Sequence, residues 1–263
     1  LHKEYRRQRQ MCIRDRNSHG FQAWKEHGVS SSFPLRFVDF PCSGPYFRGM
    51  YKILVVSLPG SPKRKTMAQR LSAQELAWEW VDGVRIATME DIPPEERNDL
   101  EAYGVARLKQ APEYVCRVTG CKRAMRRAIE RASACTEDWV LILQDDAEPM
   151  DSLDLKLKEL FRRIPDGAAC IMLHHGKRGM EERDGWMRVT GDVRSMTAFA
   201  LRPSFAPVMS QALRHWGGEA DRIWERLVRN GAFILSAEPM LVSCSQKGSD
   251  IIGGIPELKK FWE

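Results

Sequence analysis

The sequence predicts an α/β protein with a mostly parallel central sheet flanked by helices, and three observations support this prediction. Residues 139–143 form an uninterrupted apolar run of strand length, typical of a strand covered on both faces. Residues 51–58 form a second such run, which ends in a Pro-Gly turn. Between them, residues 119–134 place small and apolar side chains at helical spacing. Strand, helix and strand in this order indicate a βαβ unit with a right-handed crossover.

The helix after the first strand has the clearest local signals. Ser61 is a favourable N-cap residue, and Pro62 suits the first helical position. We therefore expect a helix over 62–71. The remaining expected elements are a strand over 78–81, a helix-like segment over 93–109, a helix over 119–134 capped by Thr119, a helix over 152–161, strands over 168–173 and 195–201, helices over 203–213 and 220–228, and late strands over 232–235 and 239–242.

Length and composition favour one α/β domain, or one such domain with a small appendage. The chain has 263 residues, of which 43% are hydrophobic and 29% charged, as in ordinary globular proteins. We divide it into an irregular basic extension over 1–50, a main domain over 51–255 and a tail over 256–263. Residues 1–20 resemble translated adapter sequence and are interpreted as an artefact; the alternative is a basic arm for an acidic partner.

The net charge of +6 is concentrated in the N-terminal extension. Residues 1–50 hold nine Lys and Arg against four Asp and Glu, a net of +5, so the rest of the chain carries about +1. A nearly neutral body is not typical of a duplex-binding protein, and we expect no nucleic-acid partner.

Cysteine usage and hydropathy favour a cytoplasmic protein. The seven cysteines are odd in number and include no Cys-x-x-Cys pair, which argues against a disulfide or zinc framework. No stretch approaches the roughly 20 apolar residues of a membrane span, so we expect none. The sequence does not predict an oligomeric state.

Oxygen-bearing side chains follow the strand 139–143 directly, at Gln144, Asp145, Asp146 and Glu148. Ligands of α/β sheets bind at the carboxyl ends of strands, so these side chains are expected at a site. In extended backbone Gln144, Asp146 and Glu148 share one face, and Asp145 points to the other. This set suits Mn²⁺ or Mg²⁺ bound to a diphosphate. The alternative is a solvated acidic loop.

The turn between the first strand and its helix is a second candidate site. A strand, a tight turn and a helix N-terminus together bind anions. Arg64 and its neighbours are candidate diphosphate contacts, and the alternative is a basic helix face exposed to solvent.

Several motifs occur in the order found in one enzyme family. A strand runs into Ser-Pro-x-Arg at residues 61–64, and an aromatic strand ends in Val-Asp-Gly at 81–83. Gly120-Cys121 precedes the strand that ends at residues 144–146, and Gln246 precedes Ser-Asp-Ile at 249–251. Over residues 51–252 the chain resembles family 25 glycosyltransferases, which include lipopolysaccharide-type and collagen-type galactosyltransferases.

Three positions depart from the family pattern. Ala124-Met125 stand where the family has Ser-His, Gln144 replaces the first acid of Glu-Asp-Asp, and Thr197 replaces an expected His. A Gln carbonyl still ligates a cation but lowers the negative charge of the site.

The resemblance implies a Rossmann-like glycosyltransferase A-type fold and transfer of a hexose, with galactose expected, from a UDP-sugar to the hydroxyl of a glycan or other acceptor, with inversion. A divalent cation, Mn²⁺ or Mg²⁺, is expected to act on the diphosphate as a Lewis acid.

The strand-end position of the carboxylates and the family resemblance together imply roles for single residues. Asp146 and then Asp145 are the expected metal ligands, with Gln144 and Glu148 as outer candidates. His175 follows a predicted strand and is either a further ligand or structural. Asp221 is the expected catalytic base, and the alternative is an exposed Asp stabilised at a helix start. The remaining candidates are donor-binding Ser57, Leu58, Pro59, Arg64 and Asp82, and acceptor-side Gln246, Ser249 and Asp250.

Two other functions stay open. One is a catalytically inactive A-type domain that binds carbohydrate or a protein partner, which Gln144 and the missing Ser-His favour. The other is nucleic-acid binding through the basic arm. Residues 176–193 are rich in glycine and charge and suggest a mobile loop or hairpin over the site, where Trp186 either stacks on a sugar or belongs to the core.

Overall fold

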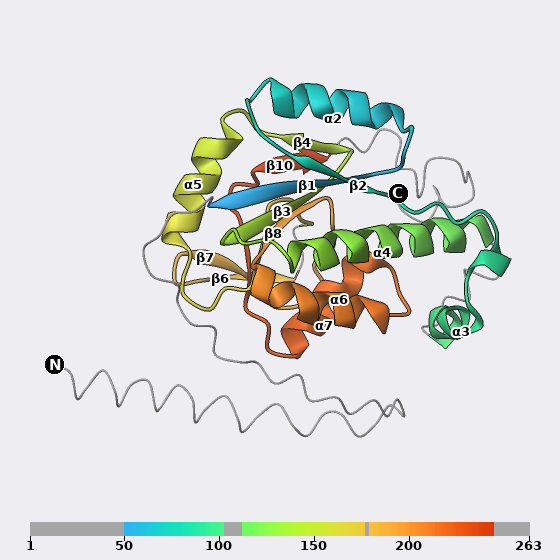
Figure 1. The fold of residues 1–263 in the computed structure, drawn as a ribbon. Coiled ribbons are helices and arrows are strands. Elements are labelled where there is room, and N and C mark those ends of the chain that lie inside the picture. The colour runs from blue at the N-terminus through green and yellow to red at the C-terminus, as the bar shows by residue number, and fades with distance from the viewer. Residues whose placement is uncertain (1–49, 103–111, 177–178, 245–263) are drawn as a thin grey trace, which may run out of the picture. The chain divides into compact units, whose positions relative to one another are not determined.

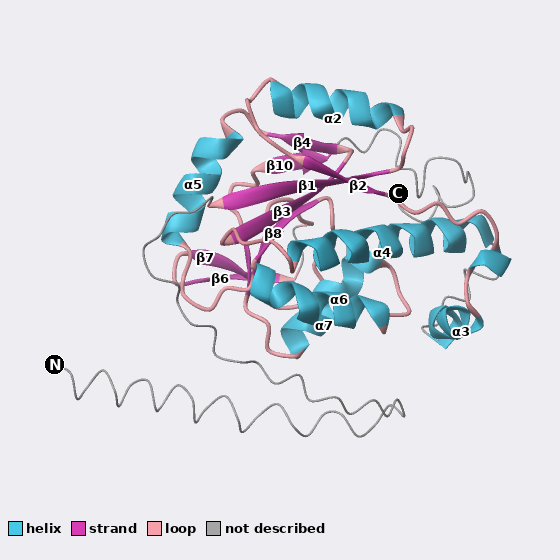
Figure 2. Cartoon of the chain, viewed as in Figure 1, coloured by secondary structure: helices cyan, strands magenta, loops and turns pink. Residues whose placement is uncertain are grey.

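The computed structural model describes residues 50–102, 112–176 and 179–244, and Figures 1 and 2 show how their helices and strands are arranged. These described residues all belong to one compact unit. The expected extension over 1–50 lies outside the described residues except for its last residue, as does the tail at 256–263, so this division stays a prediction. None of the helices in the described stretches is both long and apolar enough to cross a membrane.

An eight-stranded sheet forms the centre of the domain, with the strand order β2-β1-β3-β8-β5-β9-β7-β6. The pairings make β8 and β7 antiparallel to the other six strands. The prediction of a Rossmann-like α/β fold with a mostly parallel sheet is confirmed. The strands are β1 Tyr51–Ser57, β2 Glu79–Asp82, β3 Trp139–Gln144, β5 Cys170–Met172, β6 Met180–Arg183, β7 Trp186–Val189, β8 Ala198–Leu201 and β9 Ile234–Ser236.

Helices cover both faces of this sheet (Figure 2). Their bounds are α2 Pro62–Ser72, α3 Pro94–Ala102, α4 Pro112–Ala132, α5 Leu153–Arg163, α6 Ala206–Arg214 and α7 Ile223–Arg229, with short 3₁₀ turns η1 Met89–Asp91, η3 Pro203–Phe205 and η4 Ala220–Arg222. Ser61 caps α2 by accepting a hydrogen bond from the backbone N–H of Lys63, as the sequence predicted.

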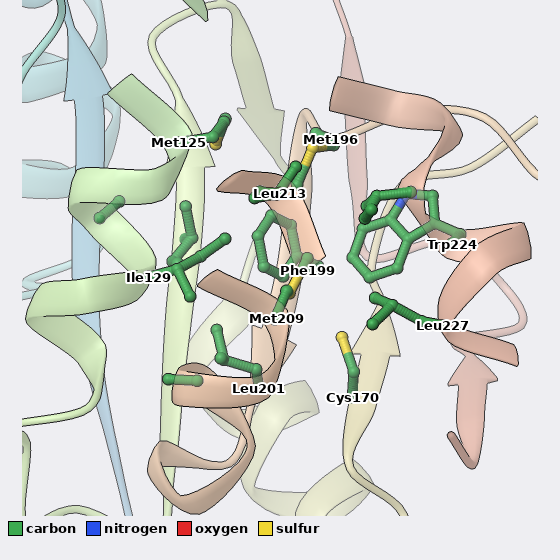
Figure 3. Packing of buried hydrophobic residues seen from close by; sticks show 14 of the residues in the cluster. Met125, Ile129, Cys170, Met196, Phe199, Leu201, Met209, Leu213, Trp224 and Leu227 are labelled. Atoms are coloured by element: carbon green, nitrogen blue, oxygen red, sulfur yellow. The ribbon is translucent and has the colours of Figure 1, made fainter. Parts of the chain in front are cut away.

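Alternate residues of β1 supply the two halves of the core, because side chains alternate along a strand. Ile53 and Val55 pack with α2 and α5, whereas Leu54 and Val56 pack with α4, α6 and α7. On the second face, Ile129 of α4 lies beside Phe199 of β8 (Figure 3). The rings of Phe199 and Trp224 pack edge to face, with 5.2 Å between their centroids.

The helix expected from Thr119 is wrong at its start. Helix α4 begins at Pro112, so Thr119 is a buried interior residue and not an N-cap. The extra turns form because Tyr114, Val115 and Val118 pack against Ile92 and Leu100 in a third hydrophobic cluster. The motif residue Gly120 therefore lies in the middle of a helix.

The segment 176–193 contains a β-hairpin, but the expected position over the site is wrong. Strands β6 and β7 are joined by Asp184 and Gly185, both with positive φ, as a two-residue hairpin turn requires. Because β7 pairs with β9, the hairpin extends the sheet at the edge opposite β2. Trp186 packs against the α2–α5 side of the core.

The residues after β3 are not extended, so the expected alternation of their side chains is wrong. Asp145 and Asp146 form a turn, and the chain then enters a short strand, β4 Ala147–Pro149. Strand β4 pairs with β10 Val242–Cys244 in a separate two-stranded sheet. The two carboxylates therefore sit on a tight bend between two strands.

Candidate functional site

A cavity of about 640 Å³ lies at the carboxyl ends of β1 and β3, a size within the usual range of ligand pockets. Its walls come from the β1–α2 turn, the loop after β2, one face of α4 and the turn after β3. The lining residues are Val56, Ser57, Leu58, Lys63, Gly83, Val84, Arg85, Ile86, Ala87, Glu113, Cys116, Arg117, Gly120, Cys121, Ala124, Gln144, Asp145 and Asp146.

Asp145 links the end of β3 to the β1–α2 turn. Its Oδ2 accepts a hydrogen bond from Ser57 Oγ at 2.5 Å and another from Ser61 Oγ at 3.2 Å. Strands β1 and β3 are parallel neighbours, so their carboxyl ends meet at the same edge of the sheet. The structure therefore places Asp145 beside the Ser61 turn and on the cavity wall, where the sequence analysis expected it.

Asp146 lies on the cavity wall in a different environment. Its buried Oδ1 has no hydrogen-bond partner among the described residues. Burial raises the pKa of this carboxyl group; the positive charge of Lys63 opposes the rise, and Asp145 adds to it. The thiol of Cys244, in β10, lies within hydrogen-bonding reach of Asp146.

The negative charges of two carboxylates act on the thiol of Cys121. Burial raises the pKa of this thiol to about 12, and the negative charges of Asp221 and Asp146 contribute to the rise, while the Gln144 amide opposes them. The amide nitrogen of Gln144 lies 3.7 Å from the Cys121 sulfur, and the Gln144 backbone N–H donates to the carbonyl oxygen of Thr197 at 2.8 Å.

Asp221 lies in η4, outside the cavity lining but close enough to affect Cys121. Burial raises the pKa of Asp221; Glu219 adds to the rise, and Arg194 and Arg222 oppose it. Asp221 is half-buried, so the alternative of an exposed Asp at a helix start does not describe it. Its role as catalytic base stays a prediction.

Arg64 faces the protein, while its neighbour Lys63 faces the cavity. The Nη2 of Arg64 donates to the Ser57 carbonyl at 2.9 Å and to Asp82 at 2.5 Å, and the guanidinium lies over the ring of Trp80. Arg64 and Asp82 therefore hold α2 against the ends of β1 and β2, and neither lines the cavity. Of the other donor-side candidates, Ser57 and Leu58 line it and Pro59 does not.

Two of the candidate metal ligands lie away from the cavity. Glu148, in β4, pairs with Arg70 of α2 at 2.7 Å. His175 is buried, with Nδ1 3.1 Å from the Gly176 carbonyl oxygen and Nε2 3.8 Å from Glu238. The acceptor-side candidates Gln246, Ser249 and Asp250 lie outside the described residues.

The described residues do not by themselves assemble a ligand set for the expected Mn²⁺ or Mg²⁺, which stays a prediction. Asp145 Oδ2 already accepts two serine hydroxyls, and the Gln144 amide faces a thiol. The buried Oδ1 of Asp146 has no hydrogen-bond partner among the described residues. Within the described ranges, no group of three His, Cys, Asp or Glu side chains is placed to hold a metal ion. Mg²⁺ is usually held by one or two carboxylates together with water and substrate phosphates, so most ligands of such an ion would come from the donor and from water.

Sequence reasoning named Arg64 and its neighbours, which include Lys63, but missed two further cavity cations, Arg85 and Arg117. Lys63 had a signal, because it follows Pro62 in the first turn of α2, where an anion would bind. Arg85 and Arg117 had none, because only the packing of α4 against the loop after β2 places them on one cavity. The two sides touch closely, since a Cβ on Gly120 would lie 2.4 Å from the Val84 carbonyl oxygen.

No protein-family model and no curated protein matches the chain. Solved structures that share a limited likeness with it include two transferases. One is a glycosyltransferase involved in the glycosylation of the major capsid of PBCV-1, with TM-score 0.41, 10% identity, and coverage of 73% of this chain and 83% of that one. Another is mannose-1-phosphate geranyltransferase from Thermus thermophilus, with TM-score 0.31, 13% identity, and coverage of 72% and 74%. Both TM-scores are low, so the function is inferred from the cavity and the motifs.

Proposed function

We propose that this protein is a glycosyltransferase that takes a nucleotide sugar as donor and a hydroxyl group as acceptor. The observation that carries the proposal is the cavity at the carboxyl ends of β1 and β3, which combines apolar walls, carboxylates and cations. A nucleotide sugar has a planar base, an anionic diphosphate and a hydroxylated ring. Each of these parts has a matching set of side chains in the cavity.

Each chemical group of a nucleotide sugar can be paired with particular side chains of the cavity. Val56, Leu58 and Ile86 supply apolar surface for a base. Asp145 and Asp146 are acceptors for the hydroxyl groups of ribose or sugar, since ionised carboxylates only accept hydrogen bonds. The cationic side chains of the cavity suit phosphate oxygens.

The finer form of the proposal rests on the resemblance to family 25. The donor is a UDP-hexose, with UDP-galactose as the first candidate, and the reaction inverts the anomeric carbon. The acceptor oxygen forms a bond to that carbon while the bond from the carbon to the diphosphate oxygen breaks. The hydroxyl proton passes to Asp221, and UDP leaves. Asp221 suits this task because its raised pKa makes it a stronger base than an ordinary carboxylate.

One observation favours a second candidate, an inactive domain of this fold that binds carbohydrate or a protein partner. Gln144 stands in the place of an acid, and its amide faces Cys121 instead of a free coordination position. Such a domain would bind a glycan in a way that does not depend on Asp221 and would not cleave any nucleotide sugar.

The test is donor cleavage by the full chain. UDP-galactose and UDP-glucose are incubated with the protein in EDTA and, separately, in Mn²⁺ or Mg²⁺, and UDP release is measured by chromatography. We expect release in at least one condition. Asp221→Asn should lower its rate about 10²–10⁴-fold, the usual contribution of general acid–base catalysis.

A matched control is Asp184→Asn, in the exposed β6–β7 turn at the far edge of the sheet. It makes the same chemical change and should leave the rate unchanged. Failure of every UDP-sugar to be cleaved or to raise Tm in any of the buffers would contradict the proposal. Glycan binding without donor cleavage would favour the second candidate.

A further inference from the structure

We infer that this cavity holds the donor diphosphate with its own cations, Lys63, Arg85 and Arg117, so that donor binding needs no divalent metal ion. The inference deepens the proposed function and rests on it. It replaces the expected Mn²⁺ or Mg²⁺ with side chains that three different elements bring to one cavity.

The first cation comes from the helix N-terminus beside the carboxylates. Lys63 is in the first turn of α2, whose N-cap is Ser61. It lines the cavity, and its charge acts on Asp146. The positive end of the helix dipole lies at the same place and favours an anion there. A positive group therefore already stands beside the carboxylate that a metal ion would bind.

The other two cations come from the opposite wall. Glu113, Arg117 and Cys121 are spaced four residues apart on α4 and share the face that lines the cavity. Arg117 is thus one helical turn from Cys121, which is close to Asp146.

Arg85 reaches the cavity through the contact at Gly120. The Val84 carbonyl and the Ile86 side chain both approach the Cα of Gly120, which has no Cβ to hold them off. Arg85 stands between these two residues and is exposed. The close approach of the loop to α4 therefore brings Arg85 to the same cavity as Arg117.

Within the described residues, no third side chain of the His, Cys, Asp or Glu type is placed with the two carboxylates to hold a metal ion. Asp145 Oδ2 accepts hydrogen bonds from Ser57 and Ser61, and the buried Oδ1 of Asp146 has no partner among the described residues. Cations that line the cavity can form charge-assisted hydrogen bonds with diphosphate oxygens, which are roughly twice as strong as neutral ones. The arginine side chains can also bind phosphate in bidentate fashion.

The test measures binding of UDP, uridine and inorganic pyrophosphate by calorimetry, in EDTA and then in Mn²⁺. In EDTA we expect UDP to bind more tightly than uridine. Lys63→Gln, Arg85→Gln and Arg117→Gln should each weaken UDP binding about tenfold to a hundredfold, the usual loss for a hydrogen bond to a charged group. Uridine binding should change little.

Two matched controls separate this effect from a change in net charge. Lys65→Gln removes an exposed cation from the same helix as Lys63, and Arg127→Gln removes one from the same helix as Arg117. Neither residue lines the cavity. Both variants should bind UDP as the unmodified chain does.

The outcomes distinguish this inference from the proposed function. UDP binding that appears only with Mn²⁺ would overturn the inference and leave the proposed function intact. Pyrophosphate binding in EDTA that Lys63→Gln weakens, without any nucleotide binding, would support the cationic site and contradict the donor. Binding of neither probe in either buffer would overturn both.

Discussion

The two halves of α4 carry different residues on their inner faces. In the second half, Met125, Ala128 and Ile129 are fully buried and pack against the sheet and α6 (Figure 3). In the first half, Arg117 and Cys121 line a cavity that no side chain fills. The second half repeats apolar residues on its inner face, whereas the first half has one side in the hydrophobic cluster around Ile92 and Leu100 and another side on the cavity. One helix thus both stabilises the domain and forms a wall of the site.

Truncation in the second half of α4 should have the largest effect on stability. Ile129→Ala should lower the free energy of unfolding by about 2–5 kcal/mol, because it leaves a cavity among fully packed side chains. Urea denaturation measures this loss, and UDP affinity of the folded protein should stay unchanged. Arg127→Ala, on the exposed face of the same helix, should change stability by less than about 0.5 kcal/mol.

A methyl group at the point where the halves meet should affect both stability and binding. In Gly120→Ala the new Cβ would lie 2.4 Å from the Val84 carbonyl oxygen, so α4 or the loop 83–87 must move. We expect a loss of about 1–3 kcal/mol from overpacking, partly offset by the roughly 1 kcal/mol better helix propensity of alanine. UDP affinity should fall as Arg85 moves away. A more stable variant with unchanged UDP affinity would show that the loop does not set the cavity.

Among these variants, Asp146→Asn should change stability the least. Burial raises the pKa of Asp146 in the folded state above its value of 3.8 in the unfolded chain. The folded protein therefore binds the proton more tightly, and Asp146 makes stability fall as pH rises above about 4. Asp146→Asn should remove this dependence and slightly raise Tm at neutral pH, while donor cleavage falls sharply.

Thermal denaturation from pH 4 to 7 measures the effect of Asp146→Asn, with Asp184→Asn as the exposed control. The control should follow the unmodified chain at every pH. A lower Tm of Asp146→Asn at neutral pH would mean that the charged carboxylate stabilises the fold, against the direction expected here.

Much of the fold followed from local sequence signals. The strand at 51–57 and the cap at Ser61 were predictable because apolar runs, N-cap residues and N-terminal prolines act over a few residues. The start of α4 was not predictable, because its first turns depend on packing against Ile92 and Leu100. Strand β4 was missed for a similar reason, since only its partner β10 makes it a strand.

The candidate site also has parts that local sequence signals predicted and parts that only tertiary packing decided. The position of Asp145 and Asp146 at the end of a buried strand was predicted, because it follows from the apolar run before them. The choice of Lys63 over Arg64 as the cavity residue was not, since both lie in the same helical turn. The contacts of Arg64 with Ser57 and Asp82 decide which side chain faces the protein.

Sequence patterns alone were enough for the α/β class, the carboxylates at the end of β3 and the capped helix that follows β1. Tertiary contacts set which charges share the cavity, because Arg85 and Arg117 come together only when the loop after β2 packs on Gly120. They also place the hairpin at the far edge of the sheet through its pairing with β9. Local preferences act over a few neighbouring residues, whereas these placements depend on contacts between segments far apart in the chain.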